Sequence, residues 1–240
     1  MRLDTSAGVV QASTYDAGWP DEDPESLAEL GGVAAGLYPG ALARAASQSP
    51  VWPGAEHAAT AHRGFVHFVV AEATGAPRAQ IEALERLAVA MLANPDALCV
   101  FFPAGESLRD GHVIGHIRAG ATEQGAVPLQ IWVNGRIADG GTGAVLADVI
   151  GLGQIGLPDA EAVFPDRKDL APYEVLGFLL DVSHHLALEG GELEEGVVYE
   201  GPGGLRWRAG LDVESGIPPA RRVVRWIPLA PDGSESQSPS

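Results

Sequence analysis

The chain has 240 residues, of which 46 % are apolar and 20 % are charged, and its formal net charge is −17 with a single lysine. This composition is typical of a globular protein, and the charge argues against a nucleic-acid-binding surface, because phosphate contacts need clustered lysines and arginines. No apolar run approaches the roughly 20 residues of a membrane-spanning helix, and no signal peptide is recognisable. Cys99 is the only cysteine, which excludes a disulfide within the chain and fits a reducing compartment. We therefore expect a soluble, cytoplasmic protein that binds neither nucleic acid nor a membrane.

The first 63 residues contain few regular patterns. An apolar run within residues 3–13 predicts an opening strand. A short helix is expected over residues 24–30, because Asp23 can cap its N-terminus and acidic residues occupy its first turn.

A strand, a helix and a second strand are predicted next. Residues 64–71 are rich in β-branched and aromatic residues, which favours a strand. Residues 77–94 carry apolar residues at helical spacing, and the apolar run at 97–102 is typical of a strand buried on both faces. Together they predict a β-α-β unit, with the two strands parallel and joined by a right-handed crossover.

The second half of the chain is predicted to be rich in strands. Residues 106–120 are ambiguous and are interpreted as helical, whereas alternation of apolar and polar residues favours a strand over 127–137. A glycine-rich turn at 139–143 predicts a hairpin, with residues 144–150 as the returning strand. Further strands are expected at 158–164, 196–200, 205–213 and 222–229.

The longest run of helical periodicity covers residues 172–189. Pro172 suits a first helical turn, Asp169 is a candidate cap, and Gly190 suits a left-handed exit. We predict an α+β fold in which this helix and the helix at 77–94 pack on a mixed parallel and antiparallel sheet. The domain is expected to span residues 1–229, with a disordered polar tail at 230–240.

Several stretches resemble a known bacterial family. They are PLQIWVN at 128–134, GLGQIGLPDAE at 151–161, FLLDVS at 178–183 inside the long helix, and GGELEEG at 190–196. This pattern over residues 128–229 resembles the domain of unknown function DUF4261, and the strand-helix-strand region at 64–102 also fits it. The usual Gly-Asp-Thr-Ile stretch of that family is not intact, since Val197 follows Gly196 here. The resemblance implies one continuous α+β domain and supplies no catalytic residues.

The histidines offer the main candidate for a metal site. His112 and His116 are spaced i,i+4 and would share a helical face that could bind zinc, although Val113 stands where a zinc protease of this type carries its general base. The possible third ligands are Asp110, His57, His62 and His67. The alternative interpretation is that all of these, and the adjacent His184 and His185, are structural, with one of the last two at the border of the packed helix face and the other in solvent.

Other candidate sites are weaker. Gly151, Gly153 and Gly156 match the dinucleotide-binding fingerprint, but Pro158 and Pro165 leave no room for the long helix that must hold the pyrophosphate, so we interpret the glycines as a bend. Cys99 lies in an apolar run and is interpreted as a small hydrophobic residue. The sequence thus indicates no catalytic residue, no cofactor site and no committed metal ligand.

Acidic residues gather in two runs of the chain. These are Asp16, Asp21, Glu22, Asp23, Glu25 and Glu29 in the first, and Glu189, Glu192, Glu194, Glu195 and Glu200 in the second. They are either solvated loops and helix starts, or a docking surface for a basic partner protein. We expect a non-enzymatic interaction or accessory protein, of which an immunity-like protein is one version, with a metal-dependent hydrolase using His112 and His116 as the alternative. The oligomeric state is left open.

Overall fold

The computed structural model describes residues 1–240 except 33–35, 50–51, 142, 191–192 and 231–240. The tail expected at 230–240 therefore lies outside the described residues from position 231 onward. The chain divides into two compact units, which are considered separately: unit 1 comprises residues 1–133 and 154–156, and unit 2 comprises residues 134–153 and 157–240. The predicted α+β class with mixed strand pairing is confirmed, while a single domain over 1–229 stays a prediction. Among the described residues, no helix is long and apolar enough to cross a bilayer.

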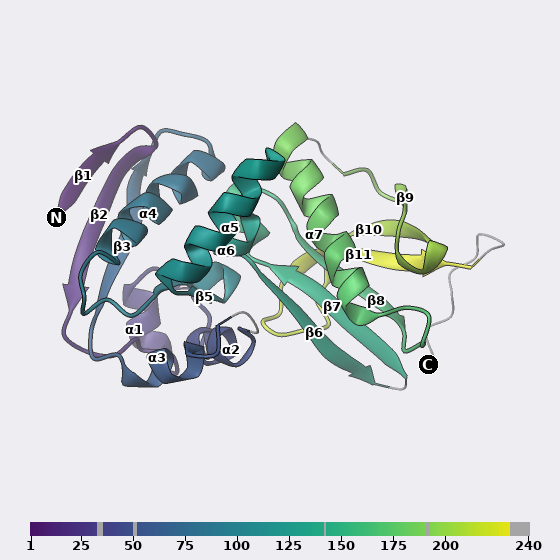
Figure 1. Ribbon diagram of the computed structural model, residues 1–240, viewed down its shortest axis with the longest axis horizontal. Coiled ribbons are helices and arrows are strands. Elements are labelled where there is room, and N and C mark those ends of the chain that lie inside the picture. The colour runs from purple at the N-terminus through teal and green to yellow at the C-terminus, as the bar shows by residue number, and fades with distance from the viewer. Residues whose placement is uncertain (33–35, 50–51, 142, 191–192, 231–240) are drawn as a thin grey trace. The chain divides into compact units, whose positions relative to one another are not determined.

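Unit 1 contains a three-stranded antiparallel sheet in the order β1-β2-β3 (Figure 1). Its strands are β1 (Arg2–Thr5), β2 (Gly8–Tyr15) and β3 (Phe65–Ala73). Gly8 is required where β2 starts, because its φ is +126° and a Cβ there would lie 1.9 Å from the carbonyl oxygen of Glu72. Helix α4 (Pro77–Met91) packs against β3, and its buried face includes Ile81.

The predicted parallel pairing of the two strands flanking α4 is wrong. Strand β4 (Val100–Phe102) pairs antiparallel with β5 (Ser107–Arg109) across the short turn Pro103–Gly105, and β3 pairs with β2. The physical reason is local: β5 reaches β4 after a turn of a few residues, and the eight-residue β2 supplies a longer partner for β3 than β4 does. Strand β3 is consequently at the end of its sheet.

The helices of unit 1 agree only partly with the sequence predictions. The expected short helix is α1 (Pro24–Glu29), and Asp23 caps it by accepting bonds from the N–H groups of Glu25 and Ser26. The serine hydroxyl bond to Asp23 is the main reason why the pKa of that carboxyl lies below its usual value. The remaining helices are α2 (Ala41–Ser47), α3 (Ala55–Ala61), α5 (Gly111–Gln124) and α6 (Leu129–Trp132).

Helix α6 occupies a segment where a strand was predicted. Leu129, Ile131 and Trp132 are all fully buried, so the apparent alternation at 127–133 is not the one-sided pattern of a half-buried strand. Pro128 precedes the helix, and the N–H of Val133 closes it by donating to the carbonyl of Leu129 at 2.9 Å. The expected strand begins only at Asn134.

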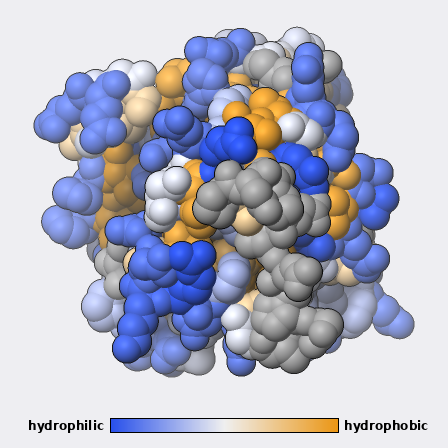
Figure 2. Space-filling view, turned by 90° about the vertical axis from the view of Figure 1, so that its right-hand side faces the viewer, coloured by the Kyte–Doolittle hydropathy of each residue, from blue (hydrophilic) through white to orange (hydrophobic). Residues whose placement is uncertain are grey.

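Unit 2 is a six-stranded mixed sheet in the order β6-β7-β8-β11-β10-β9, in which only β8 and β11 are parallel (Figure 1). Figure 2 shows one face of the molecule, on which hydrophilic side chains predominate and hydrophobic ones form small groups between them. The strands are β6 (Asn134–Gly141), β7 (Ala144–Ile150), β8 (Asp159–Pro165), β9 (Val198–Glu200), β10 (Arg206–Glu214) and β11 (Arg222–Leu229).

The long helix α7 (Pro172–Glu189) forms where it was predicted and packs on β6, β7 and β8. Phe178 contacts the rings of both Trp207 and Trp226, with ring centroids 5.5 and 5.4 Å apart. Gly190 ends the helix in the left-handed conformation, as expected. The predicted cap by Asp169 is wrong, because its carboxylate pairs with the neighbouring Arg167, and the first helical turn has no side-chain cap.

Candidate functional site

The predicted histidine pair lies on one exposed face of a helix, α5, as expected from its i,i+4 spacing. His112 and His116 are both exposed. Asp110, a suggested third ligand, instead caps the helix and accepts a bond from the N–H of Val113 at 2.8 Å. Within the described part of the chain, no three histidine, cysteine, aspartate or glutamate side chains are grouped to hold a metal ion. The hydrolase alternative therefore rests on two histidines alone.

The other suggested ligands have separate environments. His57 is exposed on α3, and both ring nitrogens of His62 are engaged: Nε2 accepts from the Trp19 N–H and Nδ1 donates to the Ala59 carbonyl, each at 2.7 Å. His67 is half-buried, and burial lowers the pKa of its imidazole. His62 is thus fixed as a structural histidine, and His67 is neutral at pH 7.

The adjacent histidines of α7 behave as predicted. His184 is half-buried, and its Nδ1 donates to the Leu180 carbonyl at 2.9 Å. His185 is exposed and lies 3.2 Å from the carboxylate of Glu189, one turn later. Each of the two histidines thus contacts a residue one turn away on its own helix.

The glycine motif at 151–156 is a bend between β7 and β8, as interpreted from the sequence. The N–H groups of Gly151 and Leu152 point at one acceptor, Oδ1 of Asp159, at 2.9 and 2.8 Å. A carboxylate of the chain itself thus occupies the position where a dinucleotide phosphate would sit. Burial raises the pKa of Asp159, against the opposing effect of the Arg221 guanidinium and these two N–H groups.

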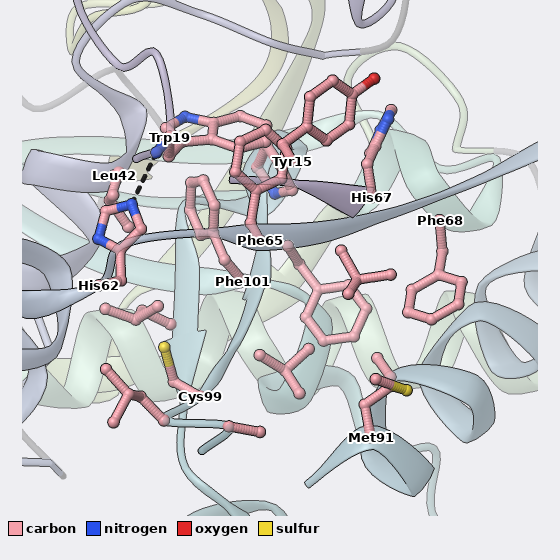
Figure 3. Close-up of a pocket in the computed structure, with 18 of the residues that line it drawn as sticks. Tyr15, Trp19, Leu42, His62, Phe65, His67, Phe68, Met91, Cys99 and Phe101 are labelled. Atoms are coloured by element: carbon pink, nitrogen blue, oxygen red, sulfur yellow. Dashed lines mark hydrogen bonds between the residues drawn. The ribbon is translucent and has the colours of Figure 1, made fainter. Parts of the chain in front are cut away.

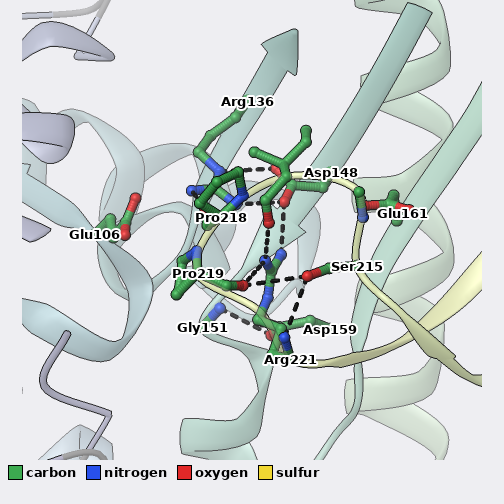
Figure 4. A network of polar contacts seen from close by, with 12 residues as sticks. Glu106, Arg136, Asp148, Gly151, Asp159, Glu161, Ser215, Pro218, Pro219 and Arg221 are labelled. Atoms are coloured by element: carbon green, nitrogen blue, oxygen red, sulfur yellow. Dashed lines mark hydrogen bonds and ion pairs between the residues drawn. The ribbon is translucent and has the colours of Figure 1, made fainter. Parts of the chain in front are cut away.

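A buried network of arginines and carboxylates extends from this bend (Figure 4). Arg136 and Asp148, cross-strand neighbours on β6 and β7, form a two-pronged pair with N–O distances of 2.9 and 2.5 Å. Arg221 bridges Asp148 and Asp159 at 2.5 and 2.6 Å. Beside them, Arg225 pairs with the fully buried Glu161 at 2.6 Å.

This network holds the loop that precedes β11. Arg136 donates to the Pro218 carbonyl, and Arg221 donates to the carbonyls of Ile217 and Pro219. Because each carboxylate already accepts several strong bonds, none is placed to act as a free general base, and we assign the network a structural role. Sequence reasoning missed it, although one signal was available: Asp148 interrupts the otherwise apolar strand β7.

Unit 1 contains an apolar cavity of about 990 Å³ (Figure 3). Its size lies at the upper end of the range for small-molecule pockets. Segments far apart in the sequence form its walls: the end of β2, all of residues 64–70 in and before β3, one face of α4, and residues 97–104 in and around β4.

Aromatic rings make up one wall of the cavity. Tyr15 stacks on Phe65 with ring centroids 4.5 Å apart, and Trp19 meets Phe65 and Phe101 edge-on at 5.2 and 5.4 Å. Figure 3 shows the rings of Tyr15, Trp19 and Phe65 grouped together, with Cys99 farther along the wall. The buried leucines 27, 30 and 37 pack behind Trp19 and Phe65. This support keeps the aromatic wall in place.

Several large apolar side chains that line the cavity are exposed to solvent. Four of them are more than a third exposed: Tyr15 (37 %), Val69 (36 %), Met91 (39 %) and Leu98 (47 %). Grouped exposure of this kind indicates an interaction site, whereas single exposed apolar residues need no explanation. The exposed charges that line the cavity are Asp16, Arg63 and Asp96.

The thiol of Cys99 lies in this cavity, and we expect it to be unreactive at neutral pH. Burial, with a smaller contribution from Asp110, raises its pKa from 9.0 to about 11. At pH 8 the folded protein should therefore hold about 100-fold less thiolate than the unfolded chain, and the alkylation rate should fall accordingly. The rate in the folded state should rise with pH up to about 11, and in urea only up to about 9.

Iodoacetamide labelling followed by mass spectrometry, with and without urea between pH 7 and 11, measures this directly. Equal rates in the folded and unfolded states at pH 8 would contradict the assignment of Cys99 as a buried neutral thiol.

One comparison with known proteins gives a match, and most of the matched residues belong to unit 2. The model of the family described as Domain of unknown function (DUF4261) matches residues 148–227, which confirms the resemblance recognised from the sequence over that segment. The match includes Asp148, Asp159, Glu161 and Arg221 of the buried network. No curated protein and no solved structure matches the chain.

Proposed function

We propose that this protein is a non-enzymatic, cytoplasmic interaction protein that binds a basic partner protein through an acidic surface of unit 1. The observation that carries the proposal is that the first acidic run begins at the apolar cavity, with Asp16 in its lining. Residues 16–29 contain six acidic residues and no basic one. Asp16 lines the cavity. Helix α1, which follows it in the chain, carries Leu27, one of the buried leucines that pack behind Trp19 and Phe65.

The exposed acids of this run are available to a partner. Asp16, Glu22, Glu25 and Glu29 are exposed, whereas Asp21 and Asp23 bind helix N–H groups. A surface that combines an apolar anchor site with charges of one sign favours protein recognition, because the charges steer the partner and the apolar site holds it.

The second acidic run gives less support. Glu189 lies beside His185, and Glu195 accepts a bond from the N–H of Leu211 at 2.6 Å. Glu192 lies outside the described residues. The run therefore serves partly to hold local structure, and we place the partner on the first run.

The test is affinity capture from the native cell extract at low salt, followed by elution with increasing salt. We expect one basic protein in near-equal amount, released as salt screens the contact. A variant that neutralises the exposed first run should lose it. That variant carries Asp16→Asn, Glu22→Gln, Glu25→Gln and Glu29→Gln.

A control with the same net charge should retain the partner, because it neutralises exposed acids elsewhere. It carries Asp4→Asn, Glu123→Gln, Glu194→Gln and Glu200→Gln. If both variants bind equally, or if nothing is captured at low salt, the proposal fails. About one zinc ion per chain in the purified protein, lost on His116→Ala, would favour the hydrolase instead.

A further inference from the structure

The cavity of unit 1 lies along the free edge of a β-strand. Every residue from 64 to 70 lines it, although successive side chains of a strand point to opposite faces. Figure 3 shows His67 and Phe68 leaving β3 in opposite directions. A cavity lined by all seven consecutive residues extends to the edge of the strand, and β3 is the edge strand of its sheet.

The outer edge of β3 has no partner strand among the described residues. The sheet order β1-β2-β3 leaves that edge unpaired, and β4 across the cavity pairs with β5 alone. Half of the N–H and C=O groups of an edge strand point outward and are free to pair with another chain.

This edge also lacks the usual protection against pairing. The segment FVHFVV at 65–70 contains no proline and no side chain charged at pH 7, since His67 is neutral. Natural edge strands are normally protected by charges, proline or a covering segment. The first charge in β3 is Glu72, beyond the stretch that lines the cavity.

We propose that unit 1 binds an extended basic segment of its partner by adding it as a strand to the outer edge of β3. This inference rests on the proposed function and specifies the site and the conformation of the partner. Apolar side chains on one face of the added strand fill the cavity beside Phe65 and Phe101. Lysines or arginines that alternate with these apolar residues lie near Asp16 and Asp96. Arg63 also lines the cavity, and its positive charge repels those of the partner.

The length of the partner segment that can pair with β3 follows from the number of β3 residues along the cavity. The six residues 65–70 correspond to an added strand of about six residues, roughly 20 Å long. Main-chain hydrogen bonds supply affinity in this mode, and the alternating side chains supply specificity.

The test uses the full chain and a synthetic seven-residue peptide that alternates lysine and valine. We expect salt-dependent binding by calorimetry. N-methylation of alternate amides should weaken binding at least tenfold in one register and little in the other, because only one set of amides faces β3. Hydrogen exchange of the amides at 65–70 should slow when the peptide binds.

A matched pair of protein variants locates the site. Val69→Lys places a positive charge on the edge of β3 and should weaken peptide binding at least tenfold. Val198→Lys changes a valine of similar exposure, 39 %, on the edge strand β9 of unit 2 and should leave binding unchanged. Circular dichroism and melting curves of both variants show whether the fold is retained.

Three results with the peptide would each overturn the inference. They are no binding of the peptide at millimolar concentration, equal binding of both N-methylated registers, and unchanged exchange at 65–70 in the complex. A dimer in which these amides are already protected would also overturn it, because a second copy would then occupy the edge. If a basic partner is still captured and lost on neutralising the first acidic run, the proposed function survives and only the strand-addition mode fails.

Discussion

Replacing Asp148 with alanine is expected to lower the free energy of unfolding of unit 2 by about 3–5 kcal/mol, the range for removing one partner of a buried ion pair. Asp148 is fully buried and accepts bonds from both Arg136 and Arg221. Without it, the guanidinium of Arg136, itself 1 % exposed, loses its carboxylate while remaining out of water. The measurement is urea denaturation followed by circular dichroism.

The control is Asp169→Ala, which removes an exposed carboxylate that also pairs with an arginine, Arg167. Surface pairs of this kind contribute little, so we expect an unchanged denaturation midpoint. If Asp148→Ala is as stable as Asp169→Ala, the network does not hold unit 2 together in the way described. Asp148→Asn should fall between them, because the amide keeps the shape and an acceptor but loses the charge.

Replacing Glu85 with alanine is expected to lower the free energy of unfolding of unit 1 by about 2–4 kcal/mol. Glu85 is 2 % exposed on α4, and its two carboxylate oxygens accept from Trp132 Nε1 at 2.8 Å and Arg118 Nε at 2.7 Å. Arg118 is 40 % exposed and can turn to water, but Trp132 is fully buried, so its N–H would be left unsatisfied. The orphaned indole group and the lost side-chain packing account for the cost.

Glu82→Ala is the matched control, since Glu82 lies on the same helix and pairs with Arg78 on the exposed side. We expect a change well below that of Glu85→Ala, measured by the same urea titration. Equal losses for the two variants would contradict the buried role of Glu85.

The same two variants also test the single-domain prediction. If residues 1–229 unfold as one cooperative domain, there is a single unfolding transition, and both Asp148→Ala and Glu85→Ala will shift it to lower urea concentration. If the two compact units unfold separately, each variant will shift one of two transitions.

Local patterns in the sequence were enough to predict the elements whose structure depends on their own residues. Helix α7 and strand β11 form at the predicted residues because apolar side chains recur at the period of one element, with Pro172 and Gly190 marking the helix ends. The hairpin of β6 and β7 follows from its glycine-rich turn. The histidine pair of α5 was likewise placed correctly on one helical face.

The tertiary structure alone decided which strands pair and which distant residues meet. Spacing favoured β3 beside β4, but β2 and β5 are the actual partners, because strand pairing depends on competition among all available edges. The cavity joins Tyr15, Phe65 and Cys99, and the ion network joins Arg136, Asp148 and Arg221, across separations that no periodicity encodes. The periodicity of a segment shows which of its side chains share a face of one helix or strand. A site needs side chains from several elements to meet, and that depends on how those elements pack together.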